Sequence, residues 1–130
     1  MFLKRPGGQS QFSSFLPPSE AATDAIGKTL IWAHNHLDKD LNVEALADRS
    51  AMSPRNFARR FVEKVGDTPS KYIEKMRVRA AKSYLETTDM PIDLIASATG
   101  FQNADRMRRS FNRTLNVNPQ EYRERFRIQN

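Results

Sequence analysis

The chain has 130 residues, of which 38% are hydrophobic, and its formal charge of +6 is uneven: residues 1–50 carry a net −1 and residues 51–130 a net +7. These figures suit one small domain, or two lobes around a shared core, with either a polyanionic partner or a solvated basic surface. Cysteine chemistry is excluded, and the sequence offers neither a membrane-spanning stretch nor a signal peptide, so we expect a cytoplasmic protein.

Residues 1–20 contain Pro6-Gly7-Gly8 and Pro17-Pro18, which interrupt any periodic pattern and indicate a tail or linker. From Ser19, a candidate helix cap, apolar residues recur at helical spacing and no strand is indicated. Asn42, residues 89–91 and Asn103 mark helix starts. Three more starts place a capping residue before proline: Ser53-Pro54, Thr68-Pro69 and Asn118-Pro119. The pattern predicts an all-α protein of about seven helices.

The second half of the chain repeats the first at a spacing of 50 residues. The matched pairs are Arg59 and Arg109, Phe61 and Phe111, Pro69 and Pro119, Tyr72 and Tyr122, and Arg77 and Arg127. Each copy contains a short apolar helix, a tight turn and a longer basic helix, which is the order of a helix-turn-helix. The second turn is Thr99-Gly100-Phe101, whereas the first, Ser50-Ala51-Met52, has no glycine.

The two basic helices, at about 54–65 and 103–115, each have one apolar stripe. At 100° per residue, Arg55 and Arg59 lie opposite the first stripe, and Asp105 and Arg109 lie opposite the second. Arginine forms bidentate hydrogen bonds with guanine in the major groove, so the pattern favours DNA recognition over an ordinary solvated face. Asp105 either accepts a hydrogen bond from a cytosine amino group or orients Arg109.

The paired motifs resemble the AraC/XylS-type DNA-binding domain. The first half of the resemblance rests on the run from Ser53 to Phe61, with Gly66, Pro69 and Tyr72 after it. The second rests on Ile95-Ala96, Gly100-Phe101, Arg109, Phe111, Pro119 and Tyr122-Arg123. The resemblance implies two helix-turn-helix lobes, at about 21–67 and 88–130. It also implies a linker helix at about 69–87, with one side formed by Tyr72, Ile73, Met76, Ala80, Ala81 and Leu85.

The first twelve residues are similar to the segment where the sensor domain ends in GlxA-like regulators, whose sensor resembles a ThiJ/PfpI-type fold. The resemblance therefore implies that residues 1–20 are a linker remnant of a longer regulator and residues 21–130 its DNA-binding domain. The implied partners are double-stranded DNA, RNA polymerase and a small-molecule effector bound by the sensor domain. No cofactor, metal or membrane partner is implied.

Family analogy also assigns site residues. The base-contact candidates are Arg55, Asn56 and Arg59 in the first lobe and Ala104, Asp105, Arg106, Arg108 and Arg109 in the second. A helical wheel, however, puts Arg108 beside the apolar stripe. The phosphate-contact candidates at helix starts and basic rims are Ser53, Thr68, Lys71, Asn103, Asn112 and Arg113. The chain departs from the common family pattern at residues 105–107 and at Asn116, so base preferences are not carried over.

Other functions have less support in the sequence. His34-Asn35-His36 resembles an endonuclease string, but residues two apart on a helix point about 200° apart and cannot share a metal. Trp32 and Tyr84 are expected in the core, which leaves no aromatic platform for RNA. A helical protein-interaction module and a non-specific nucleic-acid binder remain as alternatives. We predict a protein that is not an enzyme and that binds double-stranded DNA sequence-specifically.

Overall fold

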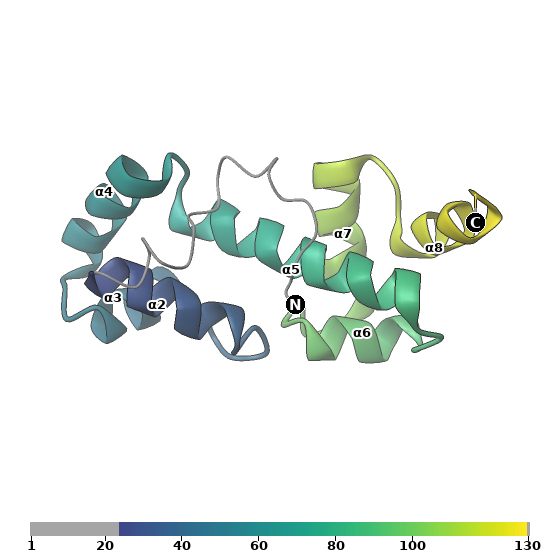
Figure 1. The fold of residues 1–130 in the computed structure, drawn as a ribbon, viewed down its shortest axis with the longest axis horizontal. Coiled ribbons are helices and arrows are strands. Elements are labelled where there is room, and N and C mark those ends of the chain that lie inside the picture. Colours follow the sequence, from purple (N-terminus) through teal and green to yellow (C-terminus); the bar gives the residue numbers. More distant parts are fainter. Residues whose placement is uncertain (1–23, 130) are drawn as a thin grey trace.

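The computed structural model describes residues 24–129, in which all regular structure is helical. Seven helices follow one another in this part of the chain: α2 (Ala25–His34), α3 (Val43–Arg49), α4 (Pro54–Val65), α5 (Pro69–Thr87), α6 (Ile92–Ala98), α7 (Ala104–Leu115) and α8 (Pro119–Gln129). The long α5 runs through the middle, with α2, α3 and α4 around its first half and α6, α7 and α8 around its second (Figure 1). The predicted tail at 1–20 and the predicted cap Ser19 lie outside the described residues.

Side-chain caps begin most of these helices. The predicted caps Asn42, Ser53, Thr68 and Asn103 each accept a hydrogen bond from the backbone N–H three residues later. Asn118 and Glu121 form a reciprocal capping box at the start of α8. Asp24, and not the predicted Ser19, caps α2. Helix α6 begins right after the predicted start at 89–91 but has no side-chain cap.

Two separate hydrophobic clusters form the interior, one in each lobe, and α5 contributes to both. Its first half places Tyr72, Ile73 and Met76 among the buried residues of the first cluster. Its second half places Val78, Ala81 and Leu85 in the second cluster. At 100° per residue these two sets point to nearly opposite sides of the helix. The prediction that Tyr72, Ile73, Met76, Ala80, Ala81 and Leu85 share one side of the linker helix was therefore wrong, because the two lobes bury different faces of α5.

The repeated aromatic residues hold each basic helix to its lobe. Phe57 and Phe61 on α4, and Phe111 on α7, are completely buried. Tyr72 meets Phe61 edge-on with ring centroids 5.5 Å apart, and Tyr122 meets Phe111 in the same way at 6.3 Å. Tyr72 is buried, whereas Tyr122 is half-buried, and the hydroxyl of Tyr122 donates a hydrogen bond to Glu86 on α5.

The two helix-turn-helix turns have the same backbone geometry. In the first, the N–H of Met52 donates to the carbonyl of Ala47; in the second, Phe101 donates to Ala96, and both N···O distances are 2.9 Å. Ala51 (φ 57°) and Gly100 (φ 89°) occupy the matched left-handed position. The turn without glycine therefore forms just as the turn with glycine does. Gly100 differs from Ala51 in its surroundings, because a Cβ atom there would lie 2.0 Å from the backbone oxygen of Leu37.

The close approach of Leu37 to Gly100 predicts that alanine substitutions at Gly66 and at Gly100 have unequal effects on stability. Gly66, the left-handed C-cap of α4, has nothing within 4 Å of a built Cβ, so Gly66→Ala is expected to cost only backbone strain, about 1 kcal/mol of unfolding free energy. Gly100→Ala adds a clash with backbone to the same strain and should cost at least about twice as much. Urea unfolding of both variants measures the difference. Equal losses would contradict the packing described for Gly100.

Candidate nucleic-acid interface

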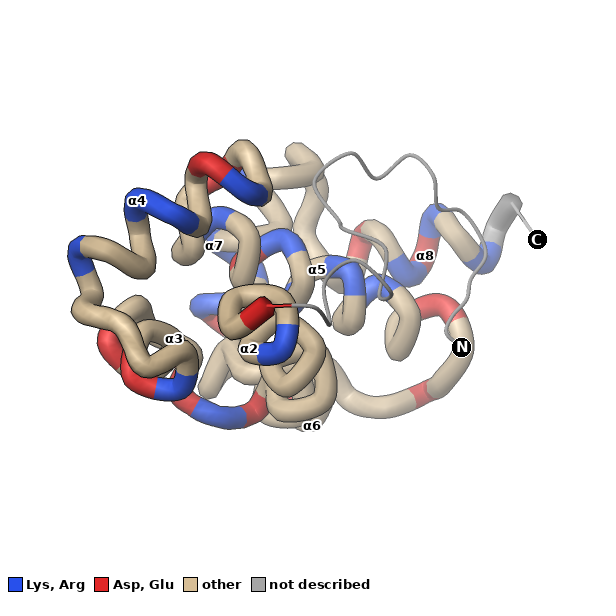
Figure 2. Tube along the Cα trace, turned by 60° about the vertical axis from the view of Figure 1, so that its left-hand side comes forward, with Lys and Arg blue, Asp and Glu red and all other residues tan. Residues whose placement is uncertain are grey.

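Helices α4 and α7, the two predicted recognition helices, lie along the same edge of the molecule. Both reach the upper edge in Figures 1 and 2, whereas α3 and α6, the first helices of the two helix-turn-helix units, lie toward the lower edge. The buried residues of α4 and α7 fasten one side of each helix to its lobe. The opposite sides are exposed and carry most of the candidate site residues, and the two helices that bear them reach the same edge.

On α4, the exposed surface is built around Arg59, whose side chain is 62% exposed. Its Nη2 donates to Oδ1 of Asn56 at 2.8 Å, and its Nη1 pairs with Oε2 of Glu63 at 3.2 Å. These contacts hold the guanidinium along the helix surface. Because exposed ion pairs contribute little stability, the guanidinium can exchange them for a base edge at low cost. Arg55 is exposed one turn earlier on the same surface.

On α7, one carboxylate organises two arginines. Oδ1 of Asp105 accepts from Arg108 at 2.6 Å, and its Oδ2 pairs with Arg109 at 3.1 Å. The hydrogen bond from Arg108 and the charges of both guanidiniums lower the pKa of Asp105. This arrangement corresponds to the orienting alternative for Asp105, extended from one arginine to two.

The remaining base-contact candidates of α7 differ in exposure. Arg108, which the helical wheel puts beside the apolar stripe, has a 51% exposed side chain that pairs with Asp105. Arg106 is exposed, and Ala104, at the first position of the helix, is half-buried. The structure thus leaves two exposed guanidiniums linked through Asp105 and a third, that of Arg106, beside them.

The phosphate-contact candidates at helix starts are also helix caps. The side-chain oxygens of Ser53, Thr68 and Asn103 accept backbone hydrogen bonds. An accepting hydroxyl keeps its own proton, and an accepting amide keeps its NH₂ group, so each side chain can still donate to a phosphate oxygen. Lys71 and Asn112 are exposed. The capping role therefore orients these donors and does not consume them.

Arg113 is engaged in a contact that the sequence did not reveal. Its guanidinium pairs with Glu74 on α5, and the same carboxylate oxygen accepts from the hydroxyl of Ser110 at 2.7 Å. Hydrogen bonding to Glu74 raises the pKa of Arg113. Helical periodicity carries no signal for this contact, because Glu74 and Arg113 are 39 residues apart. Arg113 therefore fastens α7 to α5, while its side chain stays 63% exposed.

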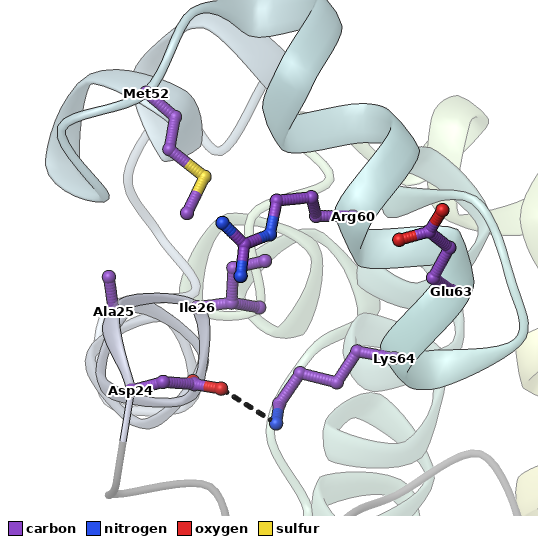
Figure 3. A pocket seen from close by; sticks show the side chains of 7 residues that line it. All are labelled: Asp24, Ala25, Ile26, Met52, Arg60, Glu63 and Lys64. Carbon is purple, nitrogen blue, oxygen red and sulfur yellow. Dashed lines mark ion pairs between the residues drawn. The ribbon is translucent and has the colours of Figure 1, made fainter.

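A surface hollow of about 410 Å³ lies behind α4, between the start of α2 and the first turn. Arg60 points into it near Met52 and Ile26, and Lys64 crosses it to pair with Asp24 at 2.8 Å (Figure 3). Arg60 thus faces α2, about 100° around the helix from Arg59. The side of α4 that carries Arg60 therefore faces α2, and a different, exposed side carries the candidate site residues.

The two histidines have different neighbours. His34 ends α2 and meets the ring of Tyr72 edge-on at 6.4 Å. His36 lies beyond the helix and stacks on Trp32 at 4.5 Å. Within residues 24–129, no group of three or more His, Cys, Asp or Glu could hold a metal ion. No helix in the described part of the chain is long and apolar enough to cross a membrane.

Trp32 and Tyr84 are half-buried, not fully in the core as expected, because each packs against the edge of its cluster. The guanidinium of Arg49 lies 3.7 Å from the centroid of the Trp32 ring and covers part of the indole. Trp32 therefore does not form an open stacking platform.

Two glutamates, Glu74 and Glu63, each pair with an arginine of a recognition helix, but they differ in exposure and in the helices they join. Glu74 is 20% exposed and joins two helices, whereas Glu63 is 63% exposed and pairs within α4. We expect Glu74→Ala to lower the urea midpoint clearly and Glu63→Ala to leave it nearly unchanged. Matching midpoints for the two variants would show that Glu74 does not fasten α7.

Comparison with known proteins agrees with this geometry. A helix-turn-helix domain family matches residues 46–125. The HTH-type transcriptional regulator Rv1931c of Mycobacterium tuberculosis is 46% identical over 81 residues, which are 62% of this chain and 31% of the regulator. This chain thus spans less than a third of that relative's length.

Two solved structures share the fold. The DNA-binding domain of AdpA, solved in complex with a target DNA, has a TM-score of 0.79 and 36% identity and covers 82% of this chain and 96% of its own. An AraC-type regulator from Chromobacterium violaceum has a TM-score of 0.70 and 24% identity, with coverages of 78% and 91%. With two helix-turn-helix units, exposed arginines on both second helices and the family match over residues 46–125, the chain belongs to the helix-turn-helix domain family.

Proposed function

We propose that this domain reads double-stranded DNA for a transcriptional regulator by inserting α4 and α7 into successive major-groove segments on one face of the duplex. The observation that carries the proposal is the pair of matched helices, α4 and α7, which both carry exposed arginines and both reach one edge of the molecule (Figures 1 and 2). Successive segments on one face of B-DNA are about 34 Å apart. The likeness to the AdpA domain, whose structure contains a target DNA, supports DNA as the ligand.

In this proposal the two groups of candidates have different tasks. Arg59 and Arg109 direct bidentate guanidiniums at guanine O6 and N7, with Arg55, Asn56 and Arg106 beside them. Asp105 keeps Arg108 and Arg109 extended until DNA displaces one of them. The capping residues Ser53, Thr68 and Asn103, together with Lys71 and Asn112, hold phosphates and thus set the register. Arg113 joins them only if DNA draws it away from Glu74.

The intact regulator requires further parts. We infer that a sensor domain precedes this chain, because residues 2–12 resemble the end of the ThiJ/PfpI-type sensor in GlxA-like regulators. That sensor would bind a small-molecule effector, and the DNA-bound regulator would contact RNA polymerase at the bacterial nucleoid. No enzymatic step is proposed for this domain, since its relatives are named as transcriptional regulators.

Selection of bound sequences from a random duplex pool, followed by gel shifts with selected and scrambled duplexes, tests the proposal. A single enriched motif bound far more tightly than its scrambled version is the expected result. Equal binding to both duplexes across salt concentrations would favour a non-specific nucleic-acid binder. Absence of binding to either duplex would favour a protein-interaction module.

Substitution of the central arginines separates base contacts from phosphate contacts. Arg59→Ala or Arg109→Ala is expected to cost about 1–3 kcal/mol of binding free energy on the selected duplex and to relax preference at one base position. Lys28→Ala, which removes an exposed cation from α2, is the control and should change neither quantity. Equal losses on selected and random DNA would reassign the arginine to a phosphate. Competition gel shifts provide the measurement.

A further inference from the structure

The two lobes meet at a contact centred on Arg77 of α5. Its Nε and Nη2 donate to the carbonyl of Leu37 at 3.3 and 3.1 Å, and Nη2 also donates to the carbonyl of Lys39 at 2.9 Å. Leu37 and Lys39 belong to the segment between α2 and α3, so one planar guanidinium holds two carbonyls of the first lobe.

The turn of the second helix-turn-helix rests on the same group. A Cβ atom built on Gly100 would lie 2.0 Å from the carbonyl oxygen of Leu37 and 2.5 Å from Nε of Arg77. The matched Ala51 has the same left-handed backbone but is exposed. Glycine at 100 is therefore required by the close approach of the lobes, and not by the turn alone. We call the contact of Arg77, Leu37, Lys39 and Gly100 the lobe junction.

The repeat provides an internal comparison for Arg77. Its counterpart Arg127 on α8 donates to the carbonyl of Thr88 at 2.7 Å and pairs with Asp89 at 2.8 Å. Both arginines thus hold the segment that precedes the first helix of a helix-turn-helix. Arg127 does so within the second lobe, whereas the carbonyl that Arg77 holds also meets a turn of the other lobe. Only the first copy of this interaction joins the lobes.

The lobe junction lies close to the start of a recognition helix. Gly100 precedes Ala104, the first residue of α7, by four residues. A shift of this turn against Leu37 would therefore move or rotate α7 relative to α4. Because α5 alone is a single rod with a lobe on each half, a second contact away from its axis restricts twisting between the lobes.

We propose that the lobe junction sets the separation and rotation of α4 and α7, and thereby the number of base pairs that the domain accepts between its two half-sites. Arg77 acts here as a positioning residue that does not contact DNA. This inference rests on the proposed function, since it concerns how two recognition helices share one duplex.

The test uses duplexes selected by the unaltered domain, with one base pair inserted or deleted between the half-sites. Each change moves one half-site by about 3.4 Å and by about 34–36° around the duplex axis. The unaltered domain should lose about tenfold or more in affinity on such duplexes. Arg77→Met keeps much of the aliphatic stem but removes all three hydrogen bonds. On the duplexes with altered spacing, this variant should lose only about threefold or less in affinity.

Arg127→Met is the matched control, because it removes the equivalent arginine without touching the lobe junction. It should retain the full tenfold spacing preference even if its thermal stability falls as much as that of Arg77→Met. If Arg77→Met does not fold, Arg77→Lys serves instead, since its ammonium keeps the charge but lacks the planar fork that reaches both carbonyls.

The outcomes separate the two proposals. If the Arg77 variant accepts the altered spacing and Arg127→Met does not, the result supports the proposal that the lobe junction sets the spacing between the half-sites. An undiminished preference in the Arg77 variant overturns it and leaves spacing to α5 alone, with the proposed function intact. If the unaltered domain selects no sequence at all, the proposed function and this inference both fail.

Discussion

Helix α5 belongs to both hydrophobic cores, and the placement of both recognition helices depends on this sharing. Neither lobe is large enough to bury its phenylalanines without help, since small units bury a low fraction of their surface. The first half of α5 covers Phe61 with Tyr72, and its second half closes the other cluster with Val78 and Leu85 on the opposite side. Each lobe is thereby fixed to the same helix, and the lobe junction adds a second contact that restricts twisting between the lobes.

Because one side of α4 and of α7 is buried against its lobe, the polar side chains on the other side are the ones that stay exposed. The apolar side chains and the contacts of Lys64 and Arg113 with Asp24 and Glu74 bind each helix to its lobe. Arg59, Arg108 and Arg109 are held by neighbours on their own helices, such as Asp105. Such exposed ion pairs hold the side chains in extended positions but contribute little stability, because water screens them. DNA can therefore replace them. The same helix therefore combines a rigid position with interchangeable polar contacts.

Much of this organisation could be predicted from local sequence patterns. Caps such as Ser53 and Asn103, the apolar stripes and the repeat of 50 residues determine where helices begin and which side they bury. Contacts between distant segments could not be predicted, because periodicity describes one helix at a time. The pairing of Arg113 with Glu74 and the two faces of α5 are of this kind. The 50-residue repeat marks Arg77 as the counterpart of Arg127, but its hydrogen bond to the carbonyl of Leu37 is seen only in the structure.

Hydroxyl-radical footprinting of the domain on a selected duplex tests the central claim most directly, namely that two helices held by one rod enter successive major-groove segments. We expect two protected windows on one face of the duplex, with centres about 10–10.5 base pairs apart. One continuous window, a single short window, or two windows on opposite faces of the duplex would contradict it.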